Sequence, residues 1–237
     1  MSYQIRLNSV YIALFSPGIV IPDKLKVASS INTALSNLFD GDPLILPLPE
    51  DIPSDFPRIE LNSKDLRYKL RIAGNNFSFI FKNPQEEEKE DLLPDEDLFK
   101  KFTTVFCYFK NELNTQFVRC GVVVDWMIKL EKQRCLEFLL EKYIKDKVPV
   151  EKPLETILRF RMRDKILEFD TNKWIEIRSV PERSVSEQKE LFVFKIDINT
   201  LAERVYKFEE ETVRSFLKSS VDVMKKELEK HKSLWEI

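Results

Sequence analysis

Two long segments with alternating apolar residues place the strongest constraint on how this 237-residue chain folds. The first runs from Tyr3 to Phe15 and the second from Gln116 to Lys129. A period of two indicates a strand whose apolar side chains share one side of a sheet. These side chains are Val10, Ile12 and Leu14 in the first segment and Val122, Val124, Trp126 and Ile128 in the second.

In the first half of the chain, a helix, three short strands and a second helix follow the long strand. Apolar residues at helical spacing after Pro22 indicate the first helix, and Gly41 is a suitable C-cap. The strands are expected at residues 58–62, 66–73 and 77–82, with turn residues between them. An apolar stripe then predicts the second helix, with Leu98, Phe102, Phe106, Phe109 and Leu113.

The second half of the chain repeats this order of elements. The apolar pattern over residues 135–144 predicts a helix, and Thr200 with Glu203 forms a capping box for a long helix from about Leu201 into the 230s. Strands are expected between these helices, at residues 154–163, 166–169, 173–179 and 191–198. The repeat predicts two strand–helix–strands–helix units, residues 1–114 and 115–237, either as separate units or within one continuous domain.

The order of elements also predicts the fold class. Two helices in each unit are enough to cover one face of an antiparallel sheet, which is an α+β arrangement. The TATA-binding-protein fold is built from a duplicated unit of this kind, and the predicted architecture resembles it. If the two sheets join, the helices would lie on the convex side and the other face would form a curved, open surface. A resemblance in fold does not carry function.

Composition excludes several kinds of catalytic centre. The single histidine rules out a multi-histidine metal site, and the four isolated glycines supply neither a glycine-rich phosphate loop nor a serine nucleophile elbow. We therefore expect a non-enzymatic protein with no catalytic residues, no cofactor and no metal site. His231 is expected to be exposed near the end of the last helix, without a partner that would orient it as a base.

A divalent-metal-dependent hydrolase or nuclease is an alternative, because a nuclease of the Asp…Glu-x-Lys type needs no histidine. Glu187, Gln188 and Lys189 have this spacing, but they lie in a polar stretch and not within a strand. The acidic run at residues 86–91 is expected to be a solvated loop. A metal role for it would need carboxylates from elsewhere in the chain.

The cysteines and the hydropathy pattern predict a cytoplasmic location. Cys107, Cys120 and Cys135 are odd in number and widely spaced in apolar surroundings, so we expect reduced thiols in the core. The N-terminus does not read as a signal peptide. No apolar run approaches the roughly 18 residues of a membrane span, so no membrane partner is expected.

Two strands with alternating basic residues carry the most informative functional pattern. Period two would place each basic set on one sheet face, where guanidinium groups can bind phosphates or carboxylates. The predicted anion-binding residues are Arg67, Lys69 and Arg71 in the first half, and Arg159, Arg161 and Arg163 with Arg178 in the second.

Neutralisation of this face by acidic neighbours is the competing interpretation. Glu60, Glu155, Glu168 and Glu176 lie on or near the adjacent strands and can pair with the basic residues. The formal net charge of −2 also lacks the basic balance that is usual in nucleic-acid-binding proteins.

The C-terminal helix offers a second contact element. Its apolar stripe, which includes Phe216 and Met224, can dock onto the sheet. Leu234 and Trp235 near its end are predicted to be exposed and to contact a protein partner.

Four segments resemble a sporadically distributed, uncharacterised family of prokaryotic proteins. The segments are Phe56 to Leu61 with Ser63 and Asp65, Phe77 to Phe81, Arg119 to Val122, and Lys195 to Thr200. The resemblance spans nearly the whole chain and departs at Leu66, where a glycine is expected after Asp65. That family has no established activity, so the resemblance implies a small soluble prokaryotic protein and no catalytic residues.

Together these patterns predict a non-enzymatic binding or adaptor protein. It would act through the open sheet face and the long C-terminal helix, with another protein as its partner. The first alternative is a nucleic-acid-binding protein that uses the basic sheet face, and the second is the metal-dependent hydrolase or nuclease.

Overall fold

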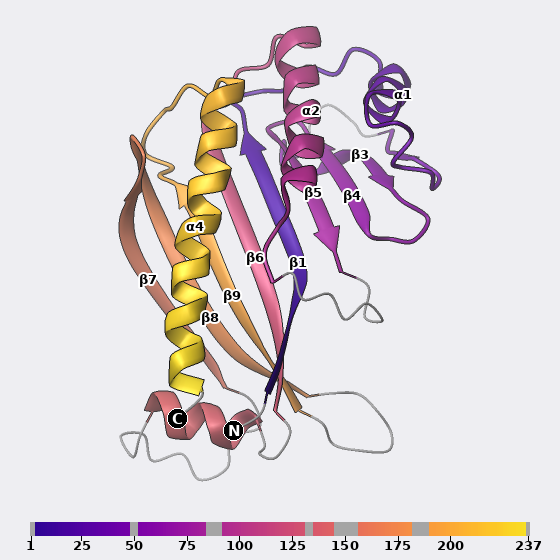
Figure 1. Ribbon diagram of the computed structural model, residues 1–237. Coiled ribbons are helices and arrows are strands. Elements are labelled where there is room, and N and C mark those ends of the chain that lie inside the picture. The colour runs from indigo at the N-terminus through magenta and orange to yellow at the C-terminus, as the bar shows by residue number, and fades with distance from the viewer. Residues whose placement is uncertain are drawn as a thin grey trace.

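The computed structural model describes residues 3–47, 52–83, 92–130, 135–144, 156–181 and 190–235. These residues form one antiparallel sheet with two long helices packed on the same face (Figure 1). The α+β class is therefore confirmed. Three predicted features lie outside the described residues: the acidic run at 86–91, Glu155, and the Glu187-Gln188-Lys189 triplet.

The elements of the first half follow the predicted order, with one short additional strand. They are β1 (Tyr3–Phe15), α1 (Lys24–Ala34), β2 (Leu44–Ile45), β3 (Pro57–Asn62), β4 (Tyr68–Ala73), β5 (Asn76–Lys82) and α2 (Glu96–Glu112). Both α-helices begin with an aspartate N-cap. The carboxylates of Asp23 and Asp95 accept hydrogen bonds from the backbone N–H of Lys26 and Leu98, which satisfies a donor that the first turn leaves free.

In the described part of the second half, four strands replace the five predicted, and β8 and β9 are longer than predicted. Its elements are β6 (Arg119–Leu130), α3 (Cys135–Leu139) continuing as a π-helix (Leu140–Ile144), β7 (Ile157–Ile166), β8 (Phe169–Pro181), β9 (Glu190–Thr200) and α4 (Glu210–Trp235). The strand expected at 166–169 is wrong, because this segment is the tight turn between β7 and β8. Leu167 in that turn has a left-handed backbone with φ of 55°.

The sheet order is β2-β3-β4-β5-β1-β6-β9-β8-β7. Each half places its last strand beside its first, so β5 pairs with β1 and β9 pairs with β6. The first strands of the two halves pair with each other in the middle of the sheet. The predicted units thus have matching strand orders, but a single sheet joins them. The division at residue 114 and the saddle shape stay predictions.

The core lies between the sheet and the helices α2 and α4. The Phe77 ring on β5 stacks on Phe109 of α2 with ring centroids 4.9 Å apart, and Phe102 lies 5.4 Å from the same ring. Trp126 on β6 is fully buried, and its indole N–H donates to the Leu92 carbonyl at 2.6 Å. Burial of each large apolar side chain stabilises the fold by about 1.5–3 kcal/mol. Among the described helices, none has the length and apolar character that crossing a bilayer would demand.

The last helix begins nine residues after its predicted start, at Glu210. Thr200 ends β9 instead of capping a helix, and its buried hydroxyl accepts a hydrogen bond from the backbone N–H of Cys120 at 3.1 Å. The segment that follows β9 brings Phe208 into a stack on Phe169, 5.1 Å between centroids. The predicted capping box is therefore wrong, because Thr200 is part of the sheet and the segment after β9 packs against Phe169 before the helix begins.

Helix α1 ends earlier than Gly41, the predicted C-cap. Leu35 is the C-cap residue, and Ser36 and Asn37 then take left-handed φ values of 54° and 60°. The side chain of Asn32 binds both the backbone N–H and the carbonyl of Phe39 and closes this turn. An asparagine-based turn therefore ends the helix in place of a glycine.

A buried ion pair ties α4 to the sheet. The Lys173 ammonium on β8 lies 2.8 Å from a Glu227 carboxylate oxygen on α4 and 3.3 Å from Asp164 on β7. Burial, the largest influence on Glu227, would raise its pKa. The hydrogen bonds and charges of Lys173 and Lys230 outweigh burial and lower that pKa below 4.5.

We expect Glu227→Gln to destabilise the protein by about 1–3 kcal/mol at pH 7, because it leaves Lys173 buried with one partner fewer. Urea denaturation measures this change. Since the folded pKa of Glu227 is lowered, its stabilising effect is present above pH 4.5 and is lost as pH falls further. The gap between wild type and variant should therefore narrow below pH 4.5. Glu229→Gln is the matched control, since this exposed residue on the same helix should change stability by less than about 0.5 kcal/mol.

Candidate functional site

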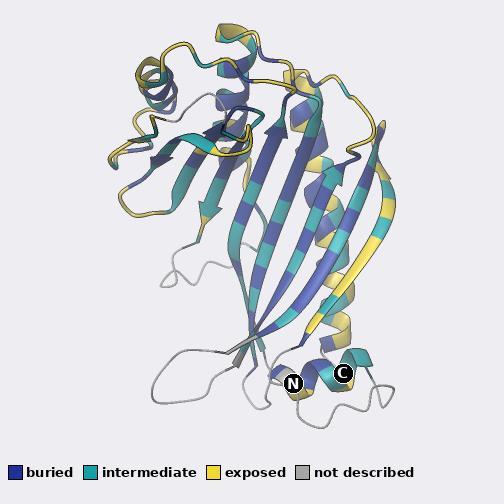
Figure 2. Ribbon diagram, turned by 180° about the vertical axis from the view of Figure 1, so that it is seen from behind, coloured by how far each residue is buried: buried dark blue, intermediate teal, exposed yellow. Residues whose placement is uncertain are grey.

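The face of the sheet opposite α2 and α4 carries no helix in the described part of the chain, and we call it the open face (Figure 2). Strand register shows which side chains share it, because paired residues in adjacent strands point to the same side. One row crosses the sheet from β4 to β7 through Lys69, Ile80, Tyr11, Val123, Asp197, Trp174 and Arg161. Basic residues from both halves therefore lie on the same face.

The structure nevertheless separates the two basic sets. Lys69 and Arg71 lie on β4, whereas Arg159, Arg161 and Arg163 lie on the edge strand β7 at the opposite side of the sheet. Strands β5, β1, β6, β9 and β8 stand between them. Arg178 joins the second set from β8, as expected from the sequence. Arg67 precedes β4 in the turn, where its Nε lies 3.7 Å from Asp65.

Two glutamates bind most of these basic side chains. Glu60 on β3 lies 3.1 Å from Lys69 Nζ and 2.9 Å from Arg71 Nε. Glu176 on β8 accepts from Arg159 Nε at 2.9 Å. It also lies within 4 Å of Arg178 and Lys195. The neutralisation considered from the sequence is therefore present at both sides of the face.

The protonation of Glu176 follows from these contacts. Burial is the largest influence and acts to raise its pKa. The hydrogen bond from Arg159 and the positive charges of Lys195, Arg159 and Arg178 outweigh burial and lower the pKa. Glu176 is thus a fixed negative charge at neutral pH that holds three basic side chains in place.

Basic residues still outnumber acidic ones on the open face. Its basic members in the described strands are Arg6, Lys69, Arg71, Lys82, Arg119, Lys129, Arg159, Arg161, Arg163, Lys165, Arg178 and Lys195, and its acidic members are Glu60, Asp125, Asp170, Glu176 and Asp197. The formal net charge of the whole chain is −2, so the excess of acidic charge lies elsewhere in the chain. A face with this balance attracts anions.

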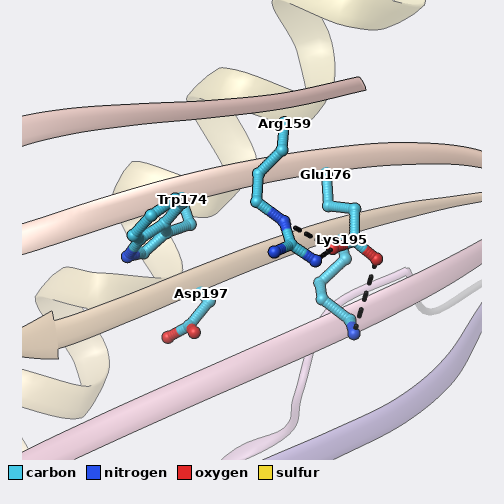
Figure 3. A pocket seen from close by; sticks show the side chains of 5 residues that line it. All are labelled: Arg159, Trp174, Glu176, Lys195 and Asp197. Atoms are coloured by element: carbon cyan, nitrogen blue, oxygen red, sulfur yellow. Dashed lines mark hydrogen bonds and ion pairs between the residues drawn. The ribbon is translucent and has the colours of Figure 1, made fainter. Parts of the chain in front are cut away.

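A hollow of about 260 Å³ lies on the β7–β8–β9 side of this face. Arg159, Trp174, Glu176, Lys195 and Asp197 line it, and Figure 3 shows the two carboxylates on either side of Lys195. The Arg161 guanidinium lies over the Trp174 ring at 5.2 Å from its centroid and donates to Asn172. An aromatic ring flanked by cationic side chains therefore lines this hollow, a combination that suits a planar or anionic ligand.

Asp197 is the titratable group of this hollow. Burial raises its pKa to about 6, against the opposing effects of a hydrogen bond from Asn199 and the charge of Lys195. Burial also raises the pKa of Asp125, the neighbour of Lys195 on β6. The acidic charge in the centre of the face thus falls when the pH drops towards 6.

The end of the C-terminal helix differs from the prediction. Trp235 has 0% of its surface exposed, and its indole N–H donates to the Tyr143 hydroxyl at 2.8 Å. Its ring also packs edge-on against Tyr3 and Phe194. The prediction that Trp235 is an exposed partner contact is wrong, because α4 ends over the π-helix and the starts of β1 and β9. Leu234 is 46% exposed and stays a predicted contact.

His231 is also less exposed than predicted and does have a partner. Its Nδ1 lies 2.9 Å from the Tyr143 hydroxyl, which also accepts from Trp235. Burial lowers the pKa of His231 and raises that of Tyr143 to about 12. The hydrogen bonds among His231, Tyr143 and Trp235 join the last turn of α4 to the π-helix, so their role is to hold these two elements together.

We expect Trp235→Ala to lower the free energy of unfolding by about 3–5 kcal/mol, because it removes a large buried ring and a hydrogen bond. Leu234→Ala, one residue earlier on the exposed side, should cost less than about 1 kcal/mol. Thermal and urea denaturation of both variants measure the difference. Equal, small losses in both variants would contradict the buried position of Trp235.

The described residues supply no ready site for a metal or a reactive thiol. Among them, no group of three or more His, Cys, Asp or Glu side chains is arranged to hold a metal ion. The metal-dependent alternative therefore has no ligand set in this part of the chain. Of the three cysteines, Cys120 and Cys135 are buried, as expected for core thiols, whereas Cys107 is only partly buried. Burial raises the pKa of Cys107 to about 11 and makes its thiolate scarce at neutral pH.

Three residues in the hollow of the open face were not among the predicted site residues. Trp174, Lys195 and Asp197 alternate with buried residues in segments that the sequence correctly predicts to be strands. The alternation placed them on the outward side, but only the sheet order puts β9 next to β8 and β8 next to β7. A search for outward aromatic residues on predicted strands would have found Trp174.

Comparisons with known proteins give no family for this chain. No family model matches it, and no curated protein matches it. A solved structure of a rolling circle replication initiator protein from Geobacillus stearothermophilus aligns with 86% of this chain and 76% of its own, at 10% identity and a TM-score of 0.31. A TM-score this low carries no argument about function.

Proposed function

We propose that this protein is a non-enzymatic binding protein whose open face binds an anionic polymer, with single-stranded nucleic acid as the class that fits best. The observation that carries the proposal is the excess of basic side chains on a helix-free sheet face that also presents aromatic rings. This is the nucleic-acid alternative of the sequence analysis, now favoured over a protein ligand for this face.

The aromatic residues favour single strands over duplexes. Trp174 and Tyr11 are partly exposed and lie in the same row across the sheet, with β9 and β6 between their strands. At the usual strand spacing they are about 14 Å apart. Bases of a single strand can stack on such rings while basic side chains bind the phosphates, without sequence preference.

The ion pairs on the face do not prevent this role. Arg159 and Arg163 keep 58% and 55% of their side-chain surface exposed while paired with Glu176 and Glu203. The Arg163–Glu203 pair is exposed on both sides and contributes little, about 0–1 kcal/mol, so a phosphate can replace that carboxylate at small cost. Glu176 is buried, so a phosphate would share Arg159 with it through the exposed part of the guanidinium. Arginine forks can then bind phosphate oxygens bidentately.

Binding of a fluorescein-labelled oligonucleotide, measured by anisotropy across a salt series, tests the proposal. We expect affinity to fall steeply with salt, and the combined change of Arg159, Arg161 and Arg163 to alanine to reduce the slope by about 2. Trp174→Ala should weaken binding by roughly tenfold through lost stacking. Lys226→Ala, an exposed charge on α4, is the control and should leave affinity unchanged. Absence of binding at low salt would refute the proposal.

The same interaction should depend on pH through Asp197. Its raised pKa means that it gains a proton as pH falls through about 6, which removes a negative charge beside Trp174 and Lys195. We therefore expect oligonucleotide affinity to rise between pH 7.5 and pH 5.5. Asp197→Asn should bind more tightly at pH 7.5 and show a flatter pH profile, whereas Asp222→Asn on α4 should retain the wild-type profile. Parallel profiles for wild type and Asp197→Asn would argue against Asp197 as the titrating group.

A further inference from the structure

Strand β7 forms one edge of the sheet and pairs only with β8 in the described part of the chain. It is ten residues long, from Ile157 to Ile166, and its register with β8 has no bulge. The opposite edge strand, β2, has only two residues. Proteins usually shorten, bend or cover a sheet edge, because the free backbone groups can pair with another strand. A ten-residue edge without a bulge, such as β7, therefore leaves more backbone groups free for pairing than the two-residue edge β2.

The register shows which backbone groups of β7 are free. Ser179 donates its backbone N–H to the Thr156 carbonyl at 3.0 Å, so these two residues form a hydrogen-bonded pair. In an antiparallel ladder such pairs recur at every second residue. The even-numbered residues of β7 therefore bond to β8, and the N–H and carbonyl groups of Arg159, Arg161 and Arg163 point away from the sheet.

The side chains of β7 make one side of this edge basic and the other side apolar. Arg159, Arg161 and Arg163 project on the open face, while Leu158, Phe160 and Met162 project on the helix side. Phe160 is 45% exposed, so its ring is only half covered by the protein itself. An added strand would meet basic side chains on one face and apolar surface on the other.

We propose that β7 binds an extended segment of a partner protein as an additional strand, and that this segment alternates acidic with apolar residues. Its backbone would pair with the free groups of Arg159, Arg161 and Arg163. Its carboxylates would lie beside the guanidinium groups on the open face, and its apolar residues would cover Phe160. This mode combines affinity from main-chain hydrogen bonds with specificity from alternate side chains.

Charge complementarity excludes a second copy of this chain as the favoured occupant. If two β7 strands paired antiparallel with their apolar faces on the same side, arginine would lie opposite arginine at every register in which the two Arg159–Arg163 segments overlap. Like charges in directly opposite positions destabilise strand pairing. An acidic segment would instead place carboxylates opposite the arginines, which stabilises strand pairing. Its charge is complementary to the exposed Arg159 and Arg163 side chains.

The inference goes beyond the proposed nucleic-acid role, because it depends on the backbone edge of β7 and not on the aromatic face. Arg161 allows the two to be separated. Its side chain serves both proposals, whereas its outward backbone N–H serves only strand addition. Arg161→Pro removes that N–H without breaking a β7–β8 hydrogen bond, and Arg161→Ala removes the side chain alone.

The experiment uses a fluorescein-labelled peptide of ten residues in which Glu alternates with Val, and measures its binding to the full chain by anisotropy. For an antiparallel added strand, we expect saturable binding that is lost when the Glu residues, whose N–H groups face β7, are replaced by their N-methyl forms in a second peptide and, separately, when Lys replaces Glu. The Arg161→Pro variant should bind the parent peptide about fivefold more weakly than Arg161→Ala, the effect of one backbone hydrogen bond. Circular dichroism checks that both variants are folded.

Several results would overturn the inference. Equal affinity for the parent, N-methylated and Lys peptides would show that the edge does not add a strand. Failure of the parent peptide to bind would also show that the edge does not add a strand, whatever affinities the two Arg161 variants have. A dimer in analytical ultracentrifugation that dissociates in Arg161→Pro would assign the edge to a second copy instead. The oligonucleotide should bind Arg161→Pro and Arg161→Ala equally, so loss of peptide binding alone leaves the proposed function untouched.

Discussion

The pairing of β1 with β6 is the interaction on which the rest of the structure depends. Val10 and Val124 are paired in the middle of the sheet and both are fully buried. This ladder joins the strands of the first half to those of the second, so it creates one continuous sheet from two similar sets of elements. Helices α2 and α4 can then share a single core on one side. The opposite side is left as an uninterrupted face that neither half could provide alone.

The β1–β6 ladder contains a register shift between Leu7 and Ser9. This shift lets Leu7 face the core while Ser9 faces the open side of the sheet. Leu7 lies opposite Trp126 in the core, whereas Ser9 donates to the Asp125 carboxylate on the open face at 3.0 Å. The bulge adds one residue to β1, so odd-numbered residues face the core before it and the open face after it. The long strands can therefore hold apolar side chains against the helices and polar side chains outward along their full length.

The charge pattern of the open face follows from strand order and not from overall composition. Glu60 and Glu176 each bind basic residues from a neighbouring strand, which fixes those side chains at the two sides of the sheet. Between them, Asp125 and Asp197 lie near Lys195 in partly buried positions, where burial raises the pKa of both carboxyl groups. The face therefore combines fixed ion pairs at its sides with groups in its centre whose charge depends on pH.

Alternation and helical spacing predicted most of the strands, the side of the sheet on which their residues lie, and the α+β class, because these patterns depend on local geometry. Alternation also placed Lys69, Arg71 and Arg161 on outward positions. The separation of β4 and β7 to opposite sides of the sheet could not be predicted locally, since strand order depends on long-range pairing. Packing likewise buried Trp235 at the end of a helix that looked free, and moved the start of α4 to Glu210. These outcomes depend on neighbours distant in the chain, which local patterns do not encode.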